Sequence, residues 1–260
     1  MTIKFKPFHY LVLSTALLLF VGCKDEPQTE NKETITMETA QTEDGTRPLE
    51  EDLNNRKTDF EKKASADKKK IYAEGLQALE ESGITKNALQ VGDVALNFTL
   101  KNASGKEVTL YDELKNGPVV LMWYRGGWCP YCNMTLHHMQ EALPEFRKNG
   151  ASLLALTPEV PDSSITTKEK NELEFEVLSD LDNTVARKYK VVFKLTDDVA
   201  ASYEKSFGLS TYNGNKKAEL PLGATYIIGQ DKVIKYAFLN IDYRKRAEPQ
   251  DLIRFLKEMK

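Results

Sequence analysis

Apolar residues recur along residues 84–260 with the spacings of strands and of helices in turn. Short apolar runs that are continuous or alternate with polar residues predict strands. We expect strands at residues 94–100, 108–110, 119–124, 151–156, 175–178, 225–228 and 233–238. Apolar positions three or four apart, with capping residues at the ends, predict helices. We expect helices at residues 130–149, 180–189 and 197–207, and from residue 249 onward. This alternation predicts an α/β fold with a central mixed sheet flanked by helices.

Two segments of different character precede this domain. Residues 51–83 are rich in lysine and glutamate, with apolar side chains at roughly helical spacing. They predict one or two amphipathic helices laid against the main domain, although a partly solvated spacer fits the pattern too. Residues 24–50 carry few large apolar side chains and cannot bury enough surface to offset the entropy of ordering them. We interpret residues 24–50 as a flexible tether.

The N-terminus has the layout of a secretory signal. Lys4 and Lys6 precede an apolar run, and Cys23 stands directly before charged residues. Phe20-Val21-Gly22-Cys23 resembles the lipobox of bacterial lipoproteins, with Phe where Leu is usual. The resemblance implies that residues 1–23 direct export and that acylated Cys23 anchors the protein to a membrane of the cell envelope, facing the periplasm or the cell surface. An uncleaved membrane anchor is the alternative, but the run is shorter than the roughly 20 residues of a spanning helix.

The composition excludes several classes of protein. Of the 260 residues, 41% are hydrophobic, which supports a folded core. The net charge of -3 argues against a nucleic-acid partner, which would call for excess Lys and Arg. Three cysteines are too few for a small domain stapled by disulfides. Once Cys23 is assigned to the anchor, only Cys129 and Cys132 remain for chemistry.

These two cysteines occur where a buried strand is followed by a helix, in Trp128-Cys129-Pro130-Tyr131-Cys132. The free N–H groups and the dipole of a helix start favour an anion and so lower the pKa of a thiol. Two intervening residues let the sulfur atoms form and break a disulfide with little backbone change. Cys132 shares the apolar helix face with Leu136, so we expect it to be the more buried sulfur and Cys129 the more exposed. Arg125 adds positive charge just upstream.

Three other interpretations of the cysteine pair compete with redox chemistry. A zinc site would add His137 and His138, but adjacent helix residues point about 100° apart and the sequence offers no second ligand pair. A static disulfide fits a location outside the cytoplasm. Two inert core thiols fit least well with an activating position at a helix start. Redox chemistry at the two sulfur atoms implies no metal and no organic cofactor beyond a redox-active disulfide.

The segment Tyr124-Arg125-Gly126-Gly127-Trp128-Cys129-Pro130-Tyr131-Cys132-Asn133 resembles the active site of a peroxiredoxin-like family within the alkyl hydroperoxide reductase and thiol-specific antioxidant group. The likeness extends over about residues 84–255. It includes the segments Val91-Gly92-Asp93, Val177-Leu178-Ser179-Asp180, Leu220-Pro221-Leu222, Ala224-Thr225-Tyr226 and Asp242-Tyr243-Arg244. The resemblance implies a thioredoxin-like fold and thiol-based redox chemistry. It also implies substrate or partner contacts at Trp128, Pro130, Tyr131, Ala224 and Thr225.

The chain departs from that family's pattern around the cysteines. If Cys132 holds the place of the peroxidatic cysteine, Arg125 and Cys129 hold the places of the family's Pro and of its Thr or Ser. The family's later active-site Arg falls near Gly223, where the sequence has none. The usual peroxide-binding set is therefore absent, and Cys129-Pro130-Tyr131-Cys132 is more similar to the active site of thioredoxins and glutaredoxins.

Two redox functions follow. In a thiol-dependent peroxidase, Cys132 attacks the peroxide, Cys129 condenses with the sulfenic acid, Arg125 stabilises the thiolate, and a thioredoxin-like protein reduces the disulfide. In a membrane-anchored thiol-disulfide oxidoreductase, Cys129 attacks a protein disulfide and Cys132 resolves the mixed disulfide. A lipid-anchored binding module with a structural disulfide is a third hypothesis. We favour the peroxidase because the resemblance covers the whole domain.

Overall fold

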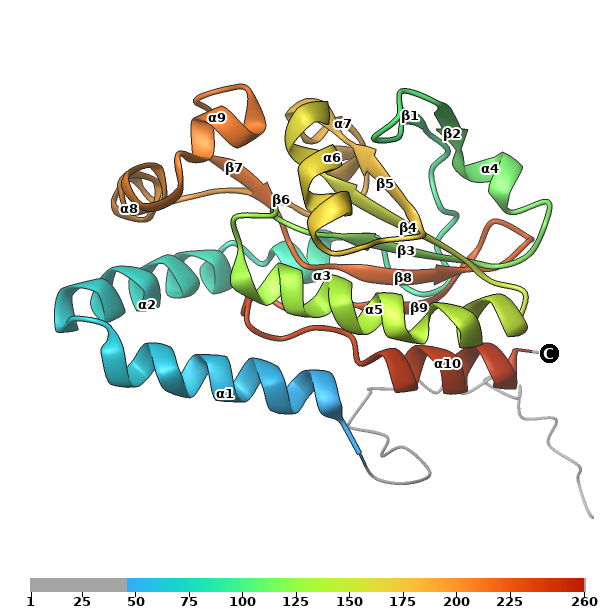
Figure 1. Cartoon of the computed structure of the whole chain (residues 1–260), viewed down its shortest axis with the longest axis horizontal. Helices are drawn as coiled ribbons and strands as arrows, with labels where there is room; N and C mark the ends of the chain where they lie inside the picture. Colours follow the sequence, from blue (N-terminus) through green and yellow to red (C-terminus); the bar gives the residue numbers. More distant parts are fainter. Residues whose placement is uncertain (1–45, 260) are drawn as a thin grey trace, which may run out of the picture. The chain divides into compact units, whose positions relative to one another are not determined.

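The computed structural model describes residues 46–259. The expected signal segment, its Cys23 and most of the expected tether lie outside the described residues. At the centre is a five-stranded mixed sheet in the order β5-β4-β3-β8-β9 (Figure 1). Its strands are β3 (Val119–Trp123), β4 (Ser152–Thr157), β5 (Glu176–Ser179), β8 (Thr225–Ile228) and β9 (Ile234–Phe238). Strands β3, β4 and β5 are parallel to one another, whereas β8 is antiparallel to both of its neighbours. The predicted α/β fold with a central mixed sheet is confirmed.

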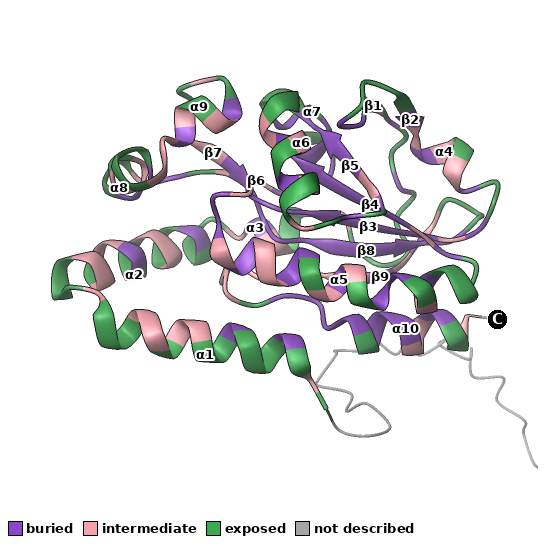
Figure 2. Cartoon of the chain, viewed as in Figure 1, coloured by how far each residue is buried: buried purple, intermediate pink, exposed green. Residues whose placement is uncertain are grey.

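Strand β3 lies in the middle of this sheet, and all five of its residues are buried (Figure 2). Its side chains alternate between two cores, with Val120 and Met122 on one face and Val119, Leu121 and Trp123 on the other. A strand covered on both faces reads as a continuous apolar run, which is why this element was visible in the sequence. The strand ends directly before the segment that carries the cysteines.

Helices cover both faces of the sheet. The long helix α5 (Pro130–Lys148) packs beside α10 (Pro249–Glu258), and α1 (Pro48–Lys63) packs against α5. The helix α2 (Ala66–Glu81) contacts α8 (Asp197–Phe207). The shorter helices are α3 (Ile84–Asn87), α4 (Leu110–Glu113), α6 (Pro161–Lys170), α7 (Thr184–Lys188) and α9 (Leu209–Asn213). None of the helices among the described residues combines the length and apolarity needed to cross a membrane.

Two helices, α1 and α2, lie where the sequence suggested one or two. The first begins at Pro48, so residues 48–50 of the expected tether are helical instead. The cause is a contact far away in the sequence: the Glu248 carboxylate accepts hydrogen bonds from the backbone N–H groups of Leu49 (3.3 Å) and Glu50 (3.0 Å). These are first-turn N–H groups, which have no partner inside a helix. Leu49 itself is fully buried.

Removing this carboxylate is expected to loosen the helix start. Glu248 is 2% exposed, so Glu248→Ala leaves two N–H donors unpaired and should lower the free energy of unfolding by about 1–2 kcal/mol. Urea denaturation measures the loss. The matched control is Glu51→Ala, which removes an exposed first-turn carboxylate from the same helix and should change stability by less than about 0.5 kcal/mol. Equal stability of both variants would show that Glu248 does not hold α1.

The structure differs from the sequence expectations at several smaller elements. The first hairpin is shorter than expected, with β1 (Thr99–Lys101) paired to β2 (Glu107–Thr109). A second small pair, β6 (Val192–Lys194) with β7 (Glu219–Pro221), was not expected. The helix expected at residues 180–189 is broken into a 3-10 turn (Leu181–Asn183) and α7. The break lies at Asp182 and Asn183, which have positive φ. Even so, the Asp180 carboxylate accepts from the N–H groups of Val185 (2.7 Å) and Ala186 (2.8 Å) and caps α7 across the break.

Candidate active site

The cysteines lie at the start of α5, after the loop that connects it to β3. Cys129 is the N-cap residue of α5 and Pro130 is its first helical residue, a position where the missing N–H of proline costs nothing. The preceding loop turns at Gly126, whose φ of 145° favours glycine. A Cβ at Gly126 would lie 2.3 Å from Nε1 of Trp128. The loop thus brings Arg125 and the indole of Trp128 back over the start of the helix.

Arg125 is the immediate partner of Cys129. Its Nη2 donates to the Sγ of Cys129 at 3.1 Å, and its Nη1 donates to the hydroxyl of Tyr203 at 3.0 Å. The guanidinium lies over the rings of Tyr243 (4.2 Å to the centroid), Trp128 (5.1 Å) and Tyr203 (5.5 Å). Three aromatic faces and a hydroxyl therefore hold a buried cation against one sulfur atom. The structure places Arg125 beside Cys129, whereas the sequence hypothesis paired it with a thiolate on Cys132.

A second arginine lies against Cys132. The Nη2 of Arg246 is 3.6 Å from the Sγ of Cys132, within hydrogen-bond range for sulfur. Its guanidinium lies directly over Gly223, because a Cβ built there would be 2.7 Å from Cζ of Arg246. No arginine stands near Gly223 in the sequence, from which we inferred that the place of the family's active-site Arg is vacant. That inference was wrong, since a side chain from a distant segment brings a guanidinium there.

The two sulfur atoms have unequal acidities. Burial alone would raise the pKa of Cys129, but a hydrogen bond from Cys132 and the guanidinium groups of Arg125 and Arg246 hold the pKa well below its ordinary value. Burial raises the pKa of Cys132, and so do the hydrogen bond to Cys129 and the negative charge of Cys129. Both residues are free thiols here. In the reduced site the thiolate therefore belongs to Cys129, with the proton on Cys132.

Both cysteines are fully buried, which corrects the expectation that Cys129 would be the more exposed one. The helical position alone suggested an open Cys129, but helices α1 and α2 approach this end of α5. Phe60 of α1 stacks on Tyr72 of α2 (5.5 Å between centroids), and Tyr72 meets the edge of Tyr203 (5.6 Å). The rings thus form a continuous apolar wall that ends at Arg125. Residues distant in sequence supply this cover, so local helical geometry could not reveal it.

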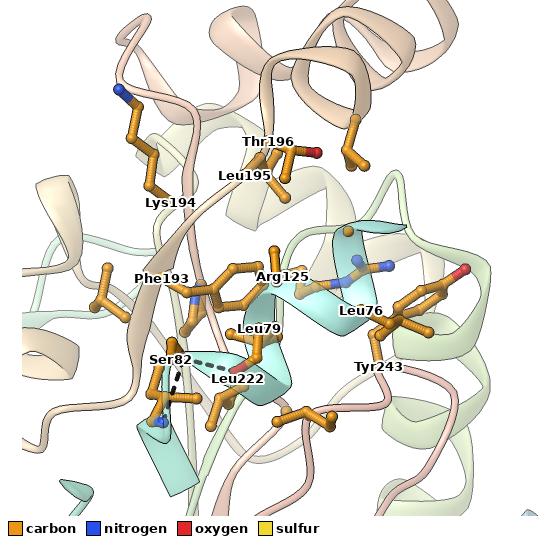
Figure 3. A pocket seen from close by; sticks show the side chains of 18 of the residues that line it. Leu76, Leu79, Ser82, Arg125, Phe193, Lys194, Leu195, Thr196, Leu222 and Tyr243 are labelled. Atoms are coloured by element: carbon orange, nitrogen blue, oxygen red, sulfur yellow. Dashed lines mark hydrogen bonds between the residues drawn. The ribbon is translucent and has the colours of Figure 1, made fainter. Parts of the chain in front are cut away.

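Two cavities reach Arg125. The smaller, of about 100 Å³, is lined by Trp128, Pro130 and Tyr131 together with Phe60 and Tyr72. The larger, of about 350 Å³, lies between α2 and β6–β7 and is mostly apolar; Figure 3 shows Arg125 beside Leu76 and Tyr243 at its edge. A water molecule occupies about 30 Å³ in the liquid, so either cavity has room for a small peroxide.

Five residues were expected to contact substrate or partner, and the structure separates them into two groups. Trp128, Pro130 and Tyr131 line the smaller cavity, although Trp128 and Tyr131 are less than a tenth exposed. Ala224 and Thr225 are buried at the start of β8, where the Ala224 carbonyl accepts from the N–H of Trp123 (2.9 Å). They line neither cavity. A substrate or partner contact at these two positions stays a prediction.

The two histidines considered for a zinc site have other surroundings. His137 is exposed, with its ring 3.4 Å from the Glu141 carboxylate. His138 lies 2.8 Å from Asp52 and helps to join α5 to α1. Within residues 46–259, no group of three or more His, Cys, Asp or Glu side chains is placed to hold a metal ion.

Sequence reasoning missed Arg246, Tyr203 and Tyr243. Arg246 and Tyr243 belong to the segment before α10 whose resemblance to the family was noted, but nothing in their spacing indicates contact with the cysteines. Tyr203 lies on the α8 face that also carries the buried Val199, so the pattern marks it as core rather than as a hydrogen-bond partner. A buried arginine is almost always paired, so the burial of Arg246 indicates a partner, but burial is known only from the structure.

Comparisons with known proteins identify the family of the chain. A family model described as AhpC/TSA family matches residues 91–237, more than half of the sequence. The chain belongs to the AhpC/TSA family. Peroxiredoxin Bcp of Escherichia coli (strain K12) is 26% identical over 172 residues, which cover 66% of this chain and 98% of that protein. The chloroplastic peroxiredoxin Q of Triticum aestivum is 28% identical over 159 residues, which cover 61% of this chain and 63% of that protein.

Solved structures agree on the fold. The crystal structure of peroxidoxin BcpB from Mycobacterium tuberculosis matches with a TM-score of 0.53 at 20% sequence identity, covering 66% of this chain and 99% of that one. The predicted thioredoxin-like fold is confirmed, and membership of the AhpC/TSA family makes the chain an oxidoreductase acting as a peroxidase. Helices α1 and α2, which contribute Phe60 and Tyr72 to the wall over the site, precede the matched residues 91–237.

Proposed function

We propose that the chain reduces peroxides with the thiolate of Cys129. The sulfur attacks one peroxide oxygen, the O–O bond breaks, and Cys129 becomes a sulfenic acid while the second oxygen leaves and takes a proton as water or an alcohol. Arg125 stabilises first the thiolate and then the negative charge that develops on the leaving oxygen. The roles of the cysteines are thereby exchanged relative to the sequence hypothesis, in which Cys132 attacked.

Cys132 then closes the cycle. Its sulfur attacks the sulfenic acid, an S–S bond forms, the S–O bond breaks, and water is released. The Cys129–Cys132 disulfide is returned to the dithiol by an external dithiol protein, for which a thioredoxin-like protein is the natural class. No organic cofactor or metal enters this cycle.

One observation carries the proposal: a guanidinium nitrogen lies 3.1 Å from a fully buried sulfur atom whose pKa is depressed. A buried, charge-stabilised thiolate suits attack on a molecule as small as a peroxide, and both cavities reach Arg125, the partner of this sulfur. To attack a protein disulfide, the reduced site would need an exposed sulfur, and in the reduced site the wall built by α1 and α2 leaves Cys129 fully buried. Reduction by a dithiol protein takes place at the oxidised site instead. The geometry therefore favours the peroxidase over the protein-disulfide oxidoreductase.

We also propose that the domain acts at a membrane. Lipidated Cys23 would anchor the chain in the cell envelope and residues 24–47 would form the tether. The support for this is the lipobox-like sequence alone.

Steady-state peroxide consumption tests the function. The full-length protein, with a thioredoxin and its reductase in excess, should consume hydrogen peroxide at least about a thousandfold faster than the same concentration of free cysteine. The rate of insulin disulfide reduction is measured in parallel and should stay near the background set by the thioredoxin. Peroxide consumption at the free-thiol rate, together with rapid insulin reduction, would reject the peroxidase in favour of the oxidoreductase.

A further inference from the structure

Arg246 is a buried cation aimed at Cys132 from a segment outside the matched family residues. It is 7% exposed, and its Nη1 donates to the carbonyl oxygens of Tyr243 and Lys245, so its own segment wraps the guanidinium. Its Nη2 faces the sulfur at 3.6 Å, and its Nε is buried without a hydrogen-bond partner. A desolvated cation with an unused donor is costly unless an anion forms beside it.

The fold makes room for this cation at one residue. Three guanidinium atoms of Arg246 lie 2.7–2.9 Å from where a Cβ on Gly223 would be. Any other residue at position 223 would displace the guanidinium. Gly223 has no positive φ, so backbone conformation does not require glycine there. Glycine is required at position 223 because the guanidinium of Arg246 approaches it so closely.

The two arginines face different sulfur atoms. Arg125 donates to Cys129, the thiolate of the reduced site, whereas the nearest sulfur to Arg246 is Cys132, which carries the proton at that stage. Oxidation changes this distribution. A sulfenic acid on Cys129 is neutral, so the charge that kept Cys132 protonated is gone while the cation beside Cys132 remains.

We propose that Arg246 is the catalytic residue of disulfide formation, in that it stabilises the Cys132 thiolate that attacks the sulfenic acid. The inference rests on the proposed function, with Cys129 as the attacking sulfur. The Cys132 thiolate forms the S–S bond, the S–O bond of Cys129 breaks, and the departing hydroxide is protonated to water. The peroxide consumed in the first step is the only oxidant. Arg125 thus serves the first step and Arg246 the second.

Stopped-flow fluorescence of the full-length protein separates the two steps, because the Trp128 indole lies beside the site. The first phase depends on peroxide concentration and reports attack, whereas the second is independent of it and reports disulfide formation. In Arg246→Ala the second phase should slow by about tenfold or more, the loss expected from one hydrogen bond to a charged group. The first phase should slow by less than about threefold, since Arg246 acts on Cys129 only through space. Dimedone should trap more sulfenic acid on Cys129 than in the wild type.

Two further variants serve as controls for Arg246→Ala. Gly223→Ala keeps the arginine but pushes its guanidinium away, and should give the same slow second phase even if Arg246→Ala does not fold. Lys245→Ala removes an exposed cation from the neighbouring position and should leave both phases unchanged. An unchanged second phase in Arg246→Ala or Gly223→Ala, or an equal slowing of both phases, would overturn the assignment. A wild-type protein with no peroxide-dependent phase would instead refute the proposed function itself.

Discussion

Cys129→Ser is expected to abolish peroxide reduction. The hydroxyl of serine is not ionised at neutral pH, so the attacking sulfur is lost and the guanidinium of Arg125 has no thiolate to stabilise. The second-order rate with hydrogen peroxide, measured by stopped flow on the reduced full-length protein, should fall by roughly a thousandfold or more, as expected when the nucleophile is lost.

Cys132→Ser is the matched control, because it removes the other sulfur of the same turn. This variant should keep the first oxidation within about threefold of wild type. It should lose turnover, because no disulfide forms and a thioredoxin has nothing to reduce. A Cys129→Ser protein that reacts at the wild-type rate would contradict the assignment of the attacking sulfur.

Arg125→Met is expected to have the second-largest effect. Methionine can still pack against Tyr243, but the hydrogen bond to Cys129 and the positive charge are lost. A hydrogen bond to a charged group contributes about 1.5–3 kcal/mol, so the rate of peroxide attack at neutral pH should fall by roughly ten- to a hundredfold. Arg125→Lys keeps the positive charge on a shorter side chain, so its rate of peroxide attack should lie between those of the wild type and Arg125→Met.

The pH dependence of the attack rate in Arg125→Met distinguishes an effect on the Cys129 thiolate from a merely structural effect, which would leave the shape of the pH profile unchanged. The wild-type pKa of Cys129 is depressed, so its attack rate should begin to decline only at a pH below the ordinary thiol range, as acid protonates the thiolate. Without Arg125 the pKa rises, and the rate should climb as the pH is raised into the alkaline range. The same depressed pKa stabilises the wild-type fold above the ordinary thiol pKa, a contribution lost as the pH falls through the folded-state pKa. An Arg125→Met profile parallel to that of the wild type would refute this role.

The sequence predicted the sheet and the position of the cysteines because both depend on local patterns. The apolar run at residues 119–124 matches β3. The helix α5 begins at Pro130, as the sequence predicted, with Cys129 as its N-cap residue. Contacts at short sequence distance, such as that of Arg125 with Cys129, follow from the same loop. These features need no knowledge of the rest of the chain.

What the sequence could not reveal depends on contacts between distant residues. The burial of Cys129 comes from a wall that includes Phe60 and Tyr72, and the cation beside Cys132 comes from a residue 114 positions later. Because those neighbours were unknown, helical position alone wrongly suggested an exposed Cys129. The attacking role was assigned to Cys132 by resemblance, whereas the hydrogen bonds and charges around the pair favour Cys129.

The most direct measurement is to map the sulfenic acid. Reduced full-length Cys132→Ser protein is treated with one equivalent of hydrogen peroxide in the presence of dimedone, and the labelled residue is found by peptide mass spectrometry. We predict a dimedone adduct on Cys129 that forms as fast as the first oxidation of the wild type. Absence of that adduct, with rapid labelling of Cys132 in the Cys129→Ser protein, would show that the peroxide reacts at the other sulfur.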